Sequence, residues 1–412
     1  MIEIKTAYVK KSGANDYQKE LLIVDEIIKN VRERGDEALF EYTKEFDNIS
    51  LSKRNIKVGE DEILDAYESM PKELLASLMR CKTNILKYHE RQAKSFEFDG
   101  KTGWKFVPVR RAGLYVPGGL AAYPSSVLMC ALPAVAAGVG DIAMVTPNVK
   151  NSAVLAAAKI CGINKIYRIG GAQAIAALAY GTESVEKVDT IAGPGNIFVT
   201  LAKKRVFGDV GIDMLAGPSE IAILADETAN PDYITADLLS QAEHGPNGAT
   251  VLVTTSVALA EKVRNGLFDA INNSKRKDII SKSIDENCQI ILVKTIKEAV
   301  SIINETASEH AEICTANAYE ISKGIYNAGA IFLGNNTPVA AGDYYAGPSH
   351  VLPTGGNCRF SSVLSIDAFQ KRISLVGYDK EELSEGASDI INMAESEGLF
   401  AHAESVRIRL KS

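Results

Sequence analysis

Histidine is the side chain that exchanges a proton near neutral pH, and this sequence contains few histidines. Most of them have neighbours that are typical of a functional site. The 412-residue chain has only five histidines, of which His89 lies in the charged run YHERQ and is predicted to be on the surface. The other four lie beside carboxylates, amides or glycines. A lone histidine is more often an ordinary hydrogen-bonded residue, but four such settings favour a shared polar site. The four are His244, His310, His350 and His402.

Gln241 and His244 are three residues apart at the end of a predicted helix, so their side chains share one face. Together with Asp343 and a further histidine they could form a cage of nitrogen and oxygen donors for Zn²⁺, which accepts imidazole and carboxylate readily. The alternative is an ordinary surface pair, because the Q-x-x-H spacing is common on exposed helices and glutamine is an unusual ligand.

Glu309 and His310 are adjacent, which suggests a different kind of site. Neighbouring residues do not share a helix face, but at a loop or a helix start both can point at one substrate. They would then supply a carboxylate and an imidazole for proton transfer. The alternative is a solvated helix start, where a glutamate is favoured by the helix dipole.

The elements that must position these residues follow from the hydrophobic pattern. The first hundred residues have helical periodicity, and after about residue 104 short apolar runs alternate with helical segments, which is typical of βαβ units and a parallel sheet. The runs fall before and after Gly217–Pro218, so we expect two doubly wound lobes. The predicted strands are 142–146, 165–169, 188–192, 221–225, 249–254, 289–293 and 330–333, and the predicted helices between them are 152–160, 173–180, 231–243 and 257–272. From about residue 365 the chain becomes polar and helical.

The tripeptide Ala-Gly-Pro occurs three times, at 192–194, 216–218 and 346–348. In open α/β sheets ligands collect at the carboxyl ends of strands, where glycine lets the backbone approach closely. Each copy alone could be an ordinary turn. Neither G-x-G-x-x-G after a strand nor the P-loop sequence occurs, so a nucleotide would have to bind by another geometry.

Composition excludes several classes of protein. With 45 Lys+Arg against 52 Asp+Glu the net charge is −7, which argues against nucleic acid or an anionic membrane as partner. The uncharged stretch between Arg111 and Asp141 is interrupted by proline and glycine, so a transmembrane helix is rejected. The charged N-terminus does not resemble a signal peptide, and the six cysteines form no C-x-x-C pair, so we expect reduced thiols and a cytoplasmic protein.

Several longer motifs resemble those of the histidinol dehydrogenases. The run IDMLAGPSEI begins at Ile212, and DLLSQAEH ends at His244. Five shorter motifs agree in type and order, so the resemblance spans roughly residues 113–402. They are GLYVPGG at 113–119, GGAQAI at 170–175, AGPGN at 192–196, GDY at 342–344 and HVLPT at 350–354.

This resemblance implies a zinc-dependent enzyme that oxidises L-histidinol to L-histidine through the aldehyde, as the last step of histidine biosynthesis, with two NAD⁺ reduced. It implies that His310 takes the proton as hydride leaves and that Glu309 activates water. The implied ligands of one Zn²⁺ per subunit, which would hold the substrate, are Gln241, His244, Asp343 and His402. Further substrate contacts would be Ser219, His350 and Glu397, and NAD⁺ contacts would be Tyr115, Gln173 and Asn196.

The resemblance also implies an architecture. The fold would be α/β with two incomplete Rossmann-like lobes, as in the aldehyde dehydrogenase superfamily, and a helical tail exchanged between the subunits of a homodimer with shared active sites. The expected parts are an N-terminal arm at 1–18, a first lobe at 19–114 plus 221–364, a second lobe at 115–220 and a tail at 365–412.

Three alternatives remain open. A relative of the same fold could oxidise another primary alcohol to its acid. An aldehyde dehydrogenase would need a cysteine thiolate, but Cys130 lies in an apolar helical run and Cys358 has no acid or base nearby in sequence, so both are interpreted as structural. A non-catalytic zinc protein would need neither Glu309–His310 nor the NAD⁺ positions.

Overall fold

The computed structural model describes residues 2–9, 17–118, 123–147, 149–245 and 247–411. These residues form two compact units, of which the first comprises 1–92 and 109–369 and the second comprises 93–108 and 370–412. Gly119, the last residue of the GLYVPGG motif, lies outside the described residues, as do 10–16 of the expected N-terminal arm.

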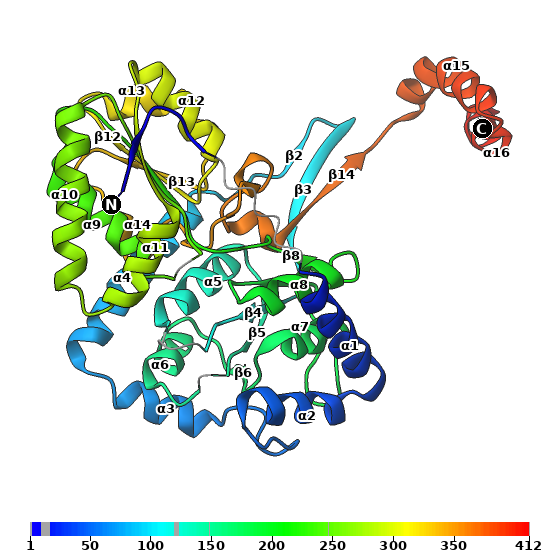
Figure 1. Cartoon of the computed structure of the whole chain (residues 1–412). Coiled ribbons are helices and arrows are strands. Elements are labelled where there is room, and N and C mark those ends of the chain that lie inside the picture. The colour runs from blue at the N-terminus through cyan, green and yellow to red at the C-terminus, as the bar shows by residue number, and fades with distance from the viewer. Residues whose placement is uncertain (1, 10–16, 119–122, 148, 246, 412) are drawn as a thin grey trace. The chain divides into compact units, whose positions relative to one another are not determined.

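The first unit contains a six-stranded parallel sheet in the order β1-β11-β10-β9-β12-β13. Alternate residues of its strands are buried on opposite faces, so both faces are covered by helices, as the βαβ pattern requires (Figure 1). Helices α9, α10 and α11 pack on one face, and α12 and α13 on the other. The strands are β1 (Ile4–Lys5), β9 (Ile221–Ala225), β10 (Thr250–Thr254), β11 (Cys288–Leu292), β12 (His310–Cys314) and β13 (Ala330–Leu333). The helices are α9 (Pro231–Ala242), α10 (Val257–Asn273), α11 (Lys277–Asn287), α12 (Ile296–Thr306), α13 (Ala318–Ser322) and α14 (Val339–Tyr344).

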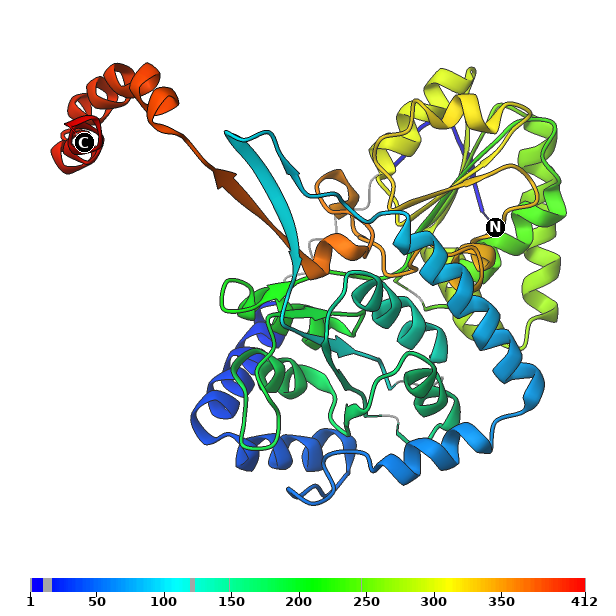
Figure 2. The same cartoon turned by 180° about the vertical axis from the view of Figure 1, so that it is seen from behind.

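The same unit contains a second parallel sheet, of five strands in the order β6-β5-β4-β7-β8. Helices α5 and α6 cover one face with α3 and α4 outside them, and α7 and α8 cover the other with α1 and α2 outside, as the view from behind also shows (Figure 2). The strands are β4 (Arg111–Tyr115), β5 (Asp141–Val145), β6 (Lys165–Tyr167), β7 (Thr190–Ala192) and β8 (Gly211–Ile212). The helices are α1 (Gln18–Arg34), α2 (Asp36–Asp47), α3 (Glu60–Glu68), α4 (Lys72–Glu90), α5 (Pro124–Ala136), α6 (Ser152–Ile160), α7 (Gly171–Tyr180) and α8 (Ile197–Val206).

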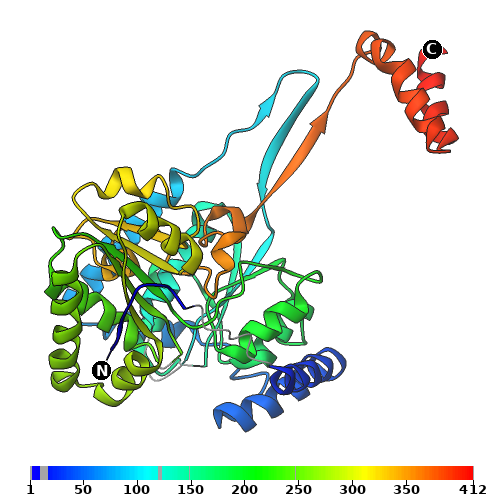
Figure 3. The same ribbon diagram turned by 45° about the horizontal axis from the view of Figure 1, so that its top comes forward.

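The second unit joins two distant segments of the chain through an antiparallel sheet. Strand β14 (Gln370–Val376) pairs along its whole length with β3 (Thr102–Pro108), which also pairs with β2 (Glu97–Phe98). Two helices follow β14, namely α15 (Lys380–Ser396) and α16 (Phe400–Lys411), and they appear in red in Figure 3. A capping box starts α15, since Asp379 accepts from the backbone of Glu382 while the Glu382 side chain accepts from that of Asp379.

The predicted α/β class with two parallel lobes is confirmed, and each predicted strand overlaps an observed one. The structure differs from the predicted boundaries, however. Strand β4 and helices α1 and α2 belong with the five-stranded sheet, so 19–114 does not join 221–364, and β1 extends the six-stranded sheet rather than forming a separate arm. The polar tail is not wholly helical, because β14 precedes its helices and pairs with 102–108. None of the described helices is long and apolar enough to cross a membrane.

Candidate active site

The predicted catalytic pair lies at the amino-terminal edge of the six-stranded sheet. His310 is the first residue of β12, and its register partner on β9 is Ile221, so Glu220 lies directly beside it. The backbone N–H of His310 donates to the Glu220 carbonyl at 3.1 Å. The pair is therefore anchored at the start of a central strand, and not at the loop or helix start that the sequence suggested.

The tautomer of His310 follows from its hydrogen bond. Its Nδ1 lies 3.0 Å from the Glu220 carbonyl oxygen, which can only accept, so Nδ1 carries the proton and donates. The other ring nitrogen, Nε2, is buried without a hydrogen-bond partner and lies 3.9 Å from Oδ1 of Asp343. Burial lowers the pKa of His310 to about 4, so the ring is neutral at pH 7 and Nε2 offers a free lone pair.

Glu309 places a buried carboxyl beside that ring. Its Oε2 accepts from the backbone N–H of Glu220 at 3.0 Å and lies 3.6 Å from Nδ1 of His310. The side chain of Ser219 donates a further hydrogen bond to it. Burial, with the nearby carboxyls of Glu220 and Asp343 as a smaller cause, raises the pKa of Glu309 well above its usual value. Ionised Glu309 is therefore a stronger base than an exposed carboxylate.

Asp343 and His350 are also in this cluster. Asp343 is on α14, and burial raises its pKa to about 6. Its backbone carbonyl accepts from Nδ1 of His350 at 3.1 Å, and Nε2 of His350 lies 3.2 Å from the hydroxyl of Ser126 on α5. His350 thus links the two lobes, and burial lowers its pKa to about 4. Both of its ring nitrogens are hydrogen-bonded, so a role in substrate binding would require one of these bonds to be exchanged.

Gln241 and His244 lie at the end of α9, as the sequence predicted. Gln241 is only 3% exposed, and its Nε2 is buried without a hydrogen-bond partner. The backbone N–H of His244 donates to the Gln241 carbonyl at 3.2 Å. His244 lies close enough for its charge to contribute, after burial, to the lowered pKa values of His310 and His350. The first unit therefore brings His244 and Asp343 into the same neighbourhood as Glu309 and His310, and Gln241 lies one helical turn before His244.

The remaining predicted residues, Glu397 and His402, belong to the second unit. Glu397 is the C-cap of α15 and His402 lies in the first turn of α16, and both side chains are exposed. Within the described residues no three His, Cys, Asp or Glu side chains converge as a metal cage. The predicted set contains a glutamine and draws one ligand from another unit, so its convergence stays a prediction.

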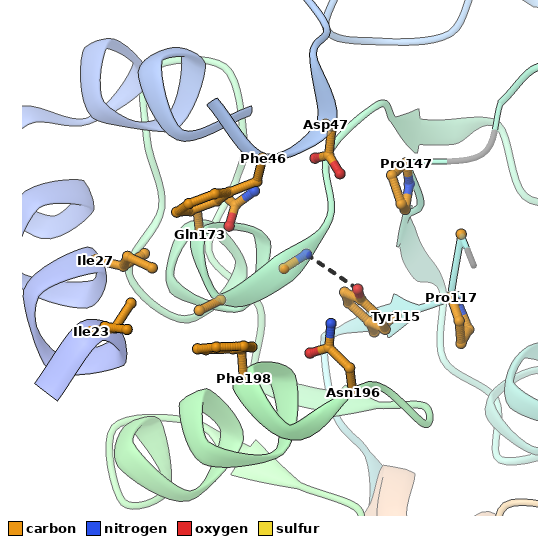
Figure 4. Close-up of a pocket in the computed structure, with 13 residues that line it drawn as sticks. Ile23, Ile27, Phe46, Asp47, Tyr115, Pro117, Pro147, Gln173, Asn196 and Phe198 are labelled. Atoms are coloured by element: carbon orange, nitrogen blue, oxygen red, sulfur yellow. Dashed lines mark hydrogen bonds between the residues drawn. The ribbon is translucent and has the colours of Figure 1, made fainter. Parts of the chain in front are cut away.

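A second candidate site is a cavity of about 450 Å³ on the five-stranded sheet. All three residues predicted to contact NAD⁺ line it: Tyr115 at the end of β4, Gln173 on α7 and Asn196 at the N-cap of α8 (Figure 4). It opens at the carboxyl ends of β4 and β7, where ligands collect in such sheets. Gln173 is 1% exposed and its amide nitrogen and oxygen are both buried without partners, as in a site that awaits a polar ligand.

Sequence reasoning missed the contribution of the N-terminal helices to this cavity. Ile23 and Ile27 of α1 and Phe46 and Asp47 of α2 complete its wall. A signal was present, because Ile23 and Phe46 are large apolar residues that are 45% and 51% exposed on otherwise polar helix faces. Such residues are unremarkable singly, and only the packing of α1 and α2 brings them together.

The turn after β7 is held by a buried ion pair that the sequence did not reveal. Gly193 has φ +124°, and a Cβ there would lie 2.1 Å from the carbonyl oxygen of Tyr115, so only glycine fits. Its N–H donates to Oδ2 of Asp213 at 2.8 Å, and its carbonyl accepts from Nζ of Lys203 at 3.0 Å. Lys203 and Asp213 also pair with each other. The pair therefore fixes both backbone groups of the turn that leads to Asn196.

Two buried carboxyl groups lie between the elements that carry the candidate active-site residues. Glu312 on β12 is 1% exposed and accepts from the N–H of Val339 at the start of α14 at 3.1 Å, and the carboxyl of Asp237 on α9 lies near enough to affect its pKa. Of two buried carboxyls that share a site, one tends to keep its proton, because two like charges repel each other. Burial, followed by the charge of Asp237, raises the pKa of Glu312 to about 9. The pair thus joins the strand and the two helices that carry His310, Gln241 and Asp343.

Comparison with known proteins decides the family. A family model described as "Histidinol dehydrogenase" matches residues 10–410. The chain belongs to the histidinol dehydrogenase family. It is 46% identical to the histidinol dehydrogenase of Heliobacterium mobile over 98% of this chain and 96% of that one, and 50% identical to that of Caldanaerobacter subterraneus subsp. tengcongensis over 94% and 91%. The crystal structure of histidinol dehydrogenase from Elizabethkingia anophelis matches with a TM-score of 0.91 at 37% identity, over 99% of this chain and 94% of that one.

Membership of the histidinol dehydrogenase family confirms the resemblance and makes the chain an oxidoreductase. The thiolate alternative also fails on chemistry, because all six cysteines are free and burial raises the pKa of every thiol, whereas a nucleophilic cysteine needs a lowered one. The prediction that His89 is on the surface was wrong. His89 is fully buried on α4, because the apolar face of that helix includes it despite its charged neighbours.

Proposed function

We propose that the chain oxidises L-histidinol to L-histidine through L-histidinaldehyde, with two NAD⁺ and one Zn²⁺ per subunit. Family membership supports the substrate. The observation that carries the chemistry is the buried, unpaired Nε2 of His310, together with the carboxyl of Glu309, which lies 3.6 Å from Nδ1 of the same ring. A neutral imidazole and a carboxyl of raised pKa are the two bases that successive oxidation of an alcohol and of an aldehyde hydrate requires.

The donor set fits zinc, and the cavity on the five-stranded sheet would hold part of a dinucleotide. Nitrogen and oxygen donors suit Zn²⁺, and the unpartnered Gln241 amide fits a ligand held at this end of α9. Bound Zn²⁺ would fix the amine and imidazole nitrogens of the substrate, and bound NAD⁺ would accept hydride. The residues that would hold the metal are Gln241, His244, Asp343 and, from the tail, His402.

In the first oxidation His310 accepts the hydroxyl proton at Nε2 while the carbinol carbon loses hydride. The hydrogen bond from Nδ1 to the Glu220 carbonyl keeps the lone pair of Nε2 toward the substrate. That bond also stabilises the imidazolium that forms, because the carbonyl oxygen faces the developing charge. His310 must release its proton before the second oxidation.

In the second oxidation Glu309 removes a proton from water as the water oxygen bonds to the aldehyde carbon, and it then returns this proton to the former aldehyde oxygen, which gives the hydrate. His310 again accepts a hydroxyl proton as the carbon of this hydrate loses hydride, which a second bound NAD⁺ would accept. The sum consumes one water, reduces two NAD⁺ and releases three protons when the product is written as a carboxylate. Because burial raises the pKa of Glu309, this half-reaction should accelerate as pH rises and the carboxyl ionises.

The tail completes the site in this proposal. Ser219 and His350 would contact substrate from the first unit, and Glu397 and His402 from the tail of the other subunit in a homodimer. The exposure of both tail side chains supports a role toward another surface.

The test is NADH formation from NAD⁺ and L-histidinol, with and without a chelator. We expect chelation to abolish turnover and Zn²⁺ to restore it, while the fold survives because each lobe has its own core. A matched reaction with another primary alcohol addresses the remaining alternative. Full activity in protein shown to be free of metal, or equal turnover of the second alcohol, would contradict the proposal.

A further inference from the structure

Asp47 is the only charged residue that lines the cavity on the five-stranded sheet, among the described residues. It is the last residue of α2, and in Figure 4 its carboxyl and the hydroxyl of Tyr115 lie on facing sides of the cavity. Its Oδ2 is buried and has no hydrogen-bond partner within the described part of the chain. Burying a carboxylate oxygen without a hydrogen-bond donor costs free energy, and a bound ligand that supplies a donor would remove this cost.

The position of the cavity decides which end of a dinucleotide it would hold. None of Glu309, His310 or Asp343 lines it, so the part of the dinucleotide that we place in it is not the reacting nicotinamide. The remaining part is the adenosine end. Apolar and aromatic side chains suited to the faces of adenine form one wall, namely Ile23, Ile27, Phe46 and Phe198.

Within a dinucleotide, the donors of the adenosine part are the 2′- and 3′-hydroxyls of its ribose and the amino group of its base. A carboxylate accepts bidentately from a ribose diol, and this is how other dinucleotide sites recognise an unphosphorylated ribose. A 2′-phosphate would remove one donor and place a second negative group beside Asp47. No lysine or arginine among the lining residues would compensate that charge.

We propose that Asp47 accepts hydrogen bonds from the adenosine ribose hydroxyls of the dinucleotide and thereby selects NAD⁺ over its 2′-phosphorylated analogue. The inference rests on the proposed use of NAD⁺ and assigns the residue that determines the choice of dinucleotide. It places the specificity at the end of α2, outside the strand and the two helices that carry Tyr115, Gln173 and Asn196.

The first experiment uses the native protein, so it does not depend on any variant folding. Calorimetry measures the affinity for NAD⁺, AMP, 2′-deoxy-AMP and adenosine 2′,5′-bisphosphate in the absence of turnover. We expect 2′-deoxy-AMP to bind about tenfold or more weakly than AMP, the usual effect of losing a hydrogen bond to a charged group. The bisphosphate should bind more weakly still. Equal affinity for AMP and 2′-deoxy-AMP, or tighter binding of the bisphosphate, would overturn the assignment.

The second experiment compares Asp47→Asn with Glu45→Gln. Glu45 is on the same helix but exposed and outside the cavity, so its variant removes the same charge without touching the site. Asp47→Asn should lower the affinity for AMP about tenfold and narrow the preference for AMP over the bisphosphate, whereas Glu45→Gln should change neither. An unchanged preference in Asp47→Asn would refute the role of Asp47 alone. Failure of the native protein to bind NAD⁺ would refute the proposed cofactor as well.

Discussion

Replacing Lys203 by methionine tests whether the buried ion pair holds the turn after β7. The side chains of Lys203 and Asp213 are 3% and 0% exposed, so the substitution leaves a carboxylate buried without its counterion and removes the donor to the Gly193 carbonyl. Removing one partner of a buried pair costs about 3–5 kcal/mol. Asp213 keeps backbone donors from Gly193 and Met214, so we expect the lower end of that range, about 3 kcal/mol.

The assay is urea unfolding followed by circular dichroism, with Arg205→Met as the matched control. Arg205 is on the same helix and pairs with Asp25 at 2.7 Å, but both side chains are more than 40% exposed, so its loss should cost at most about 1 kcal/mol. Adding Asp213→Asn to Lys203→Met should recover part of the loss, because the amide oxygen can still accept from Gly193 without a buried charge. A free energy of unfolding for Lys203→Met that equals that of Arg205→Met would refute the reasoning.

Three further predictions concern the catalytic cluster and the tail. Glu309→Gln should slow aldehyde oxidation by about 10²-fold or more while sparing alcohol oxidation, and the rate of the second half-reaction should no longer rise with pH. His310→Asn should slow both hydride transfers. Equal loss of rate in both half-reactions for Glu309→Gln would contradict the role assigned to Glu309. Because burial raises the pKa of Glu312 to about 9, the folded chain holds a proton there that the unfolded chain releases, so stability falls as pH rises from about 4 through 9. The melting temperature of Glu312→Gln should therefore fall less than that of the native protein between pH 6 and 9. Parallel curves of melting temperature against pH for the two proteins would argue against the protonated pair. If tails are exchanged, co-expression of His402→Ala chains with His310→Asn chains should recover roughly a quarter of native activity, because half the dimers are mixed and each of these has one intact site. If each tail serves its own subunit, no activity should be recovered.

Much of the fold could be predicted because its strands are buried on both faces. The run at 221–225 is apolar throughout, and the run at 250–254 is apolar between two threonines, which is typical of central strands in a parallel sheet. Strand β12 was missed because its sequence, HAEIC, begins with a histidine and contains a glutamate. His310 belongs to the candidate active site and Glu312 to the buried carboxyl pair. These two polar residues break the apolar pattern by which a buried strand is recognised.

Contacts between segments that are distant in the chain could not be predicted from the sequence. Nothing local to α1 and α2 indicates that they pack outside α7 and α8, so the lobe boundary was misplaced. The pairing of β14 with β3 joins segments more than 260 residues apart, and a solvated strand of this kind has no strong pattern. In the same way, the unpartnered Oδ2 of Asp47 and the buried Lys203–Asp213 pair can be recognised only in the folded chain.

The central claim is a four-electron oxidation at one site, and its stoichiometry is the most direct test. Limiting L-histidinol is incubated to completion with excess NAD⁺, and NADH, L-histidine and L-histidinaldehyde are quantified in the same sample. The account predicts two NADH and one L-histidine for each L-histidinol consumed, with no accumulated aldehyde. One NADH for each L-histidinol, with the aldehyde as the product, would contradict it.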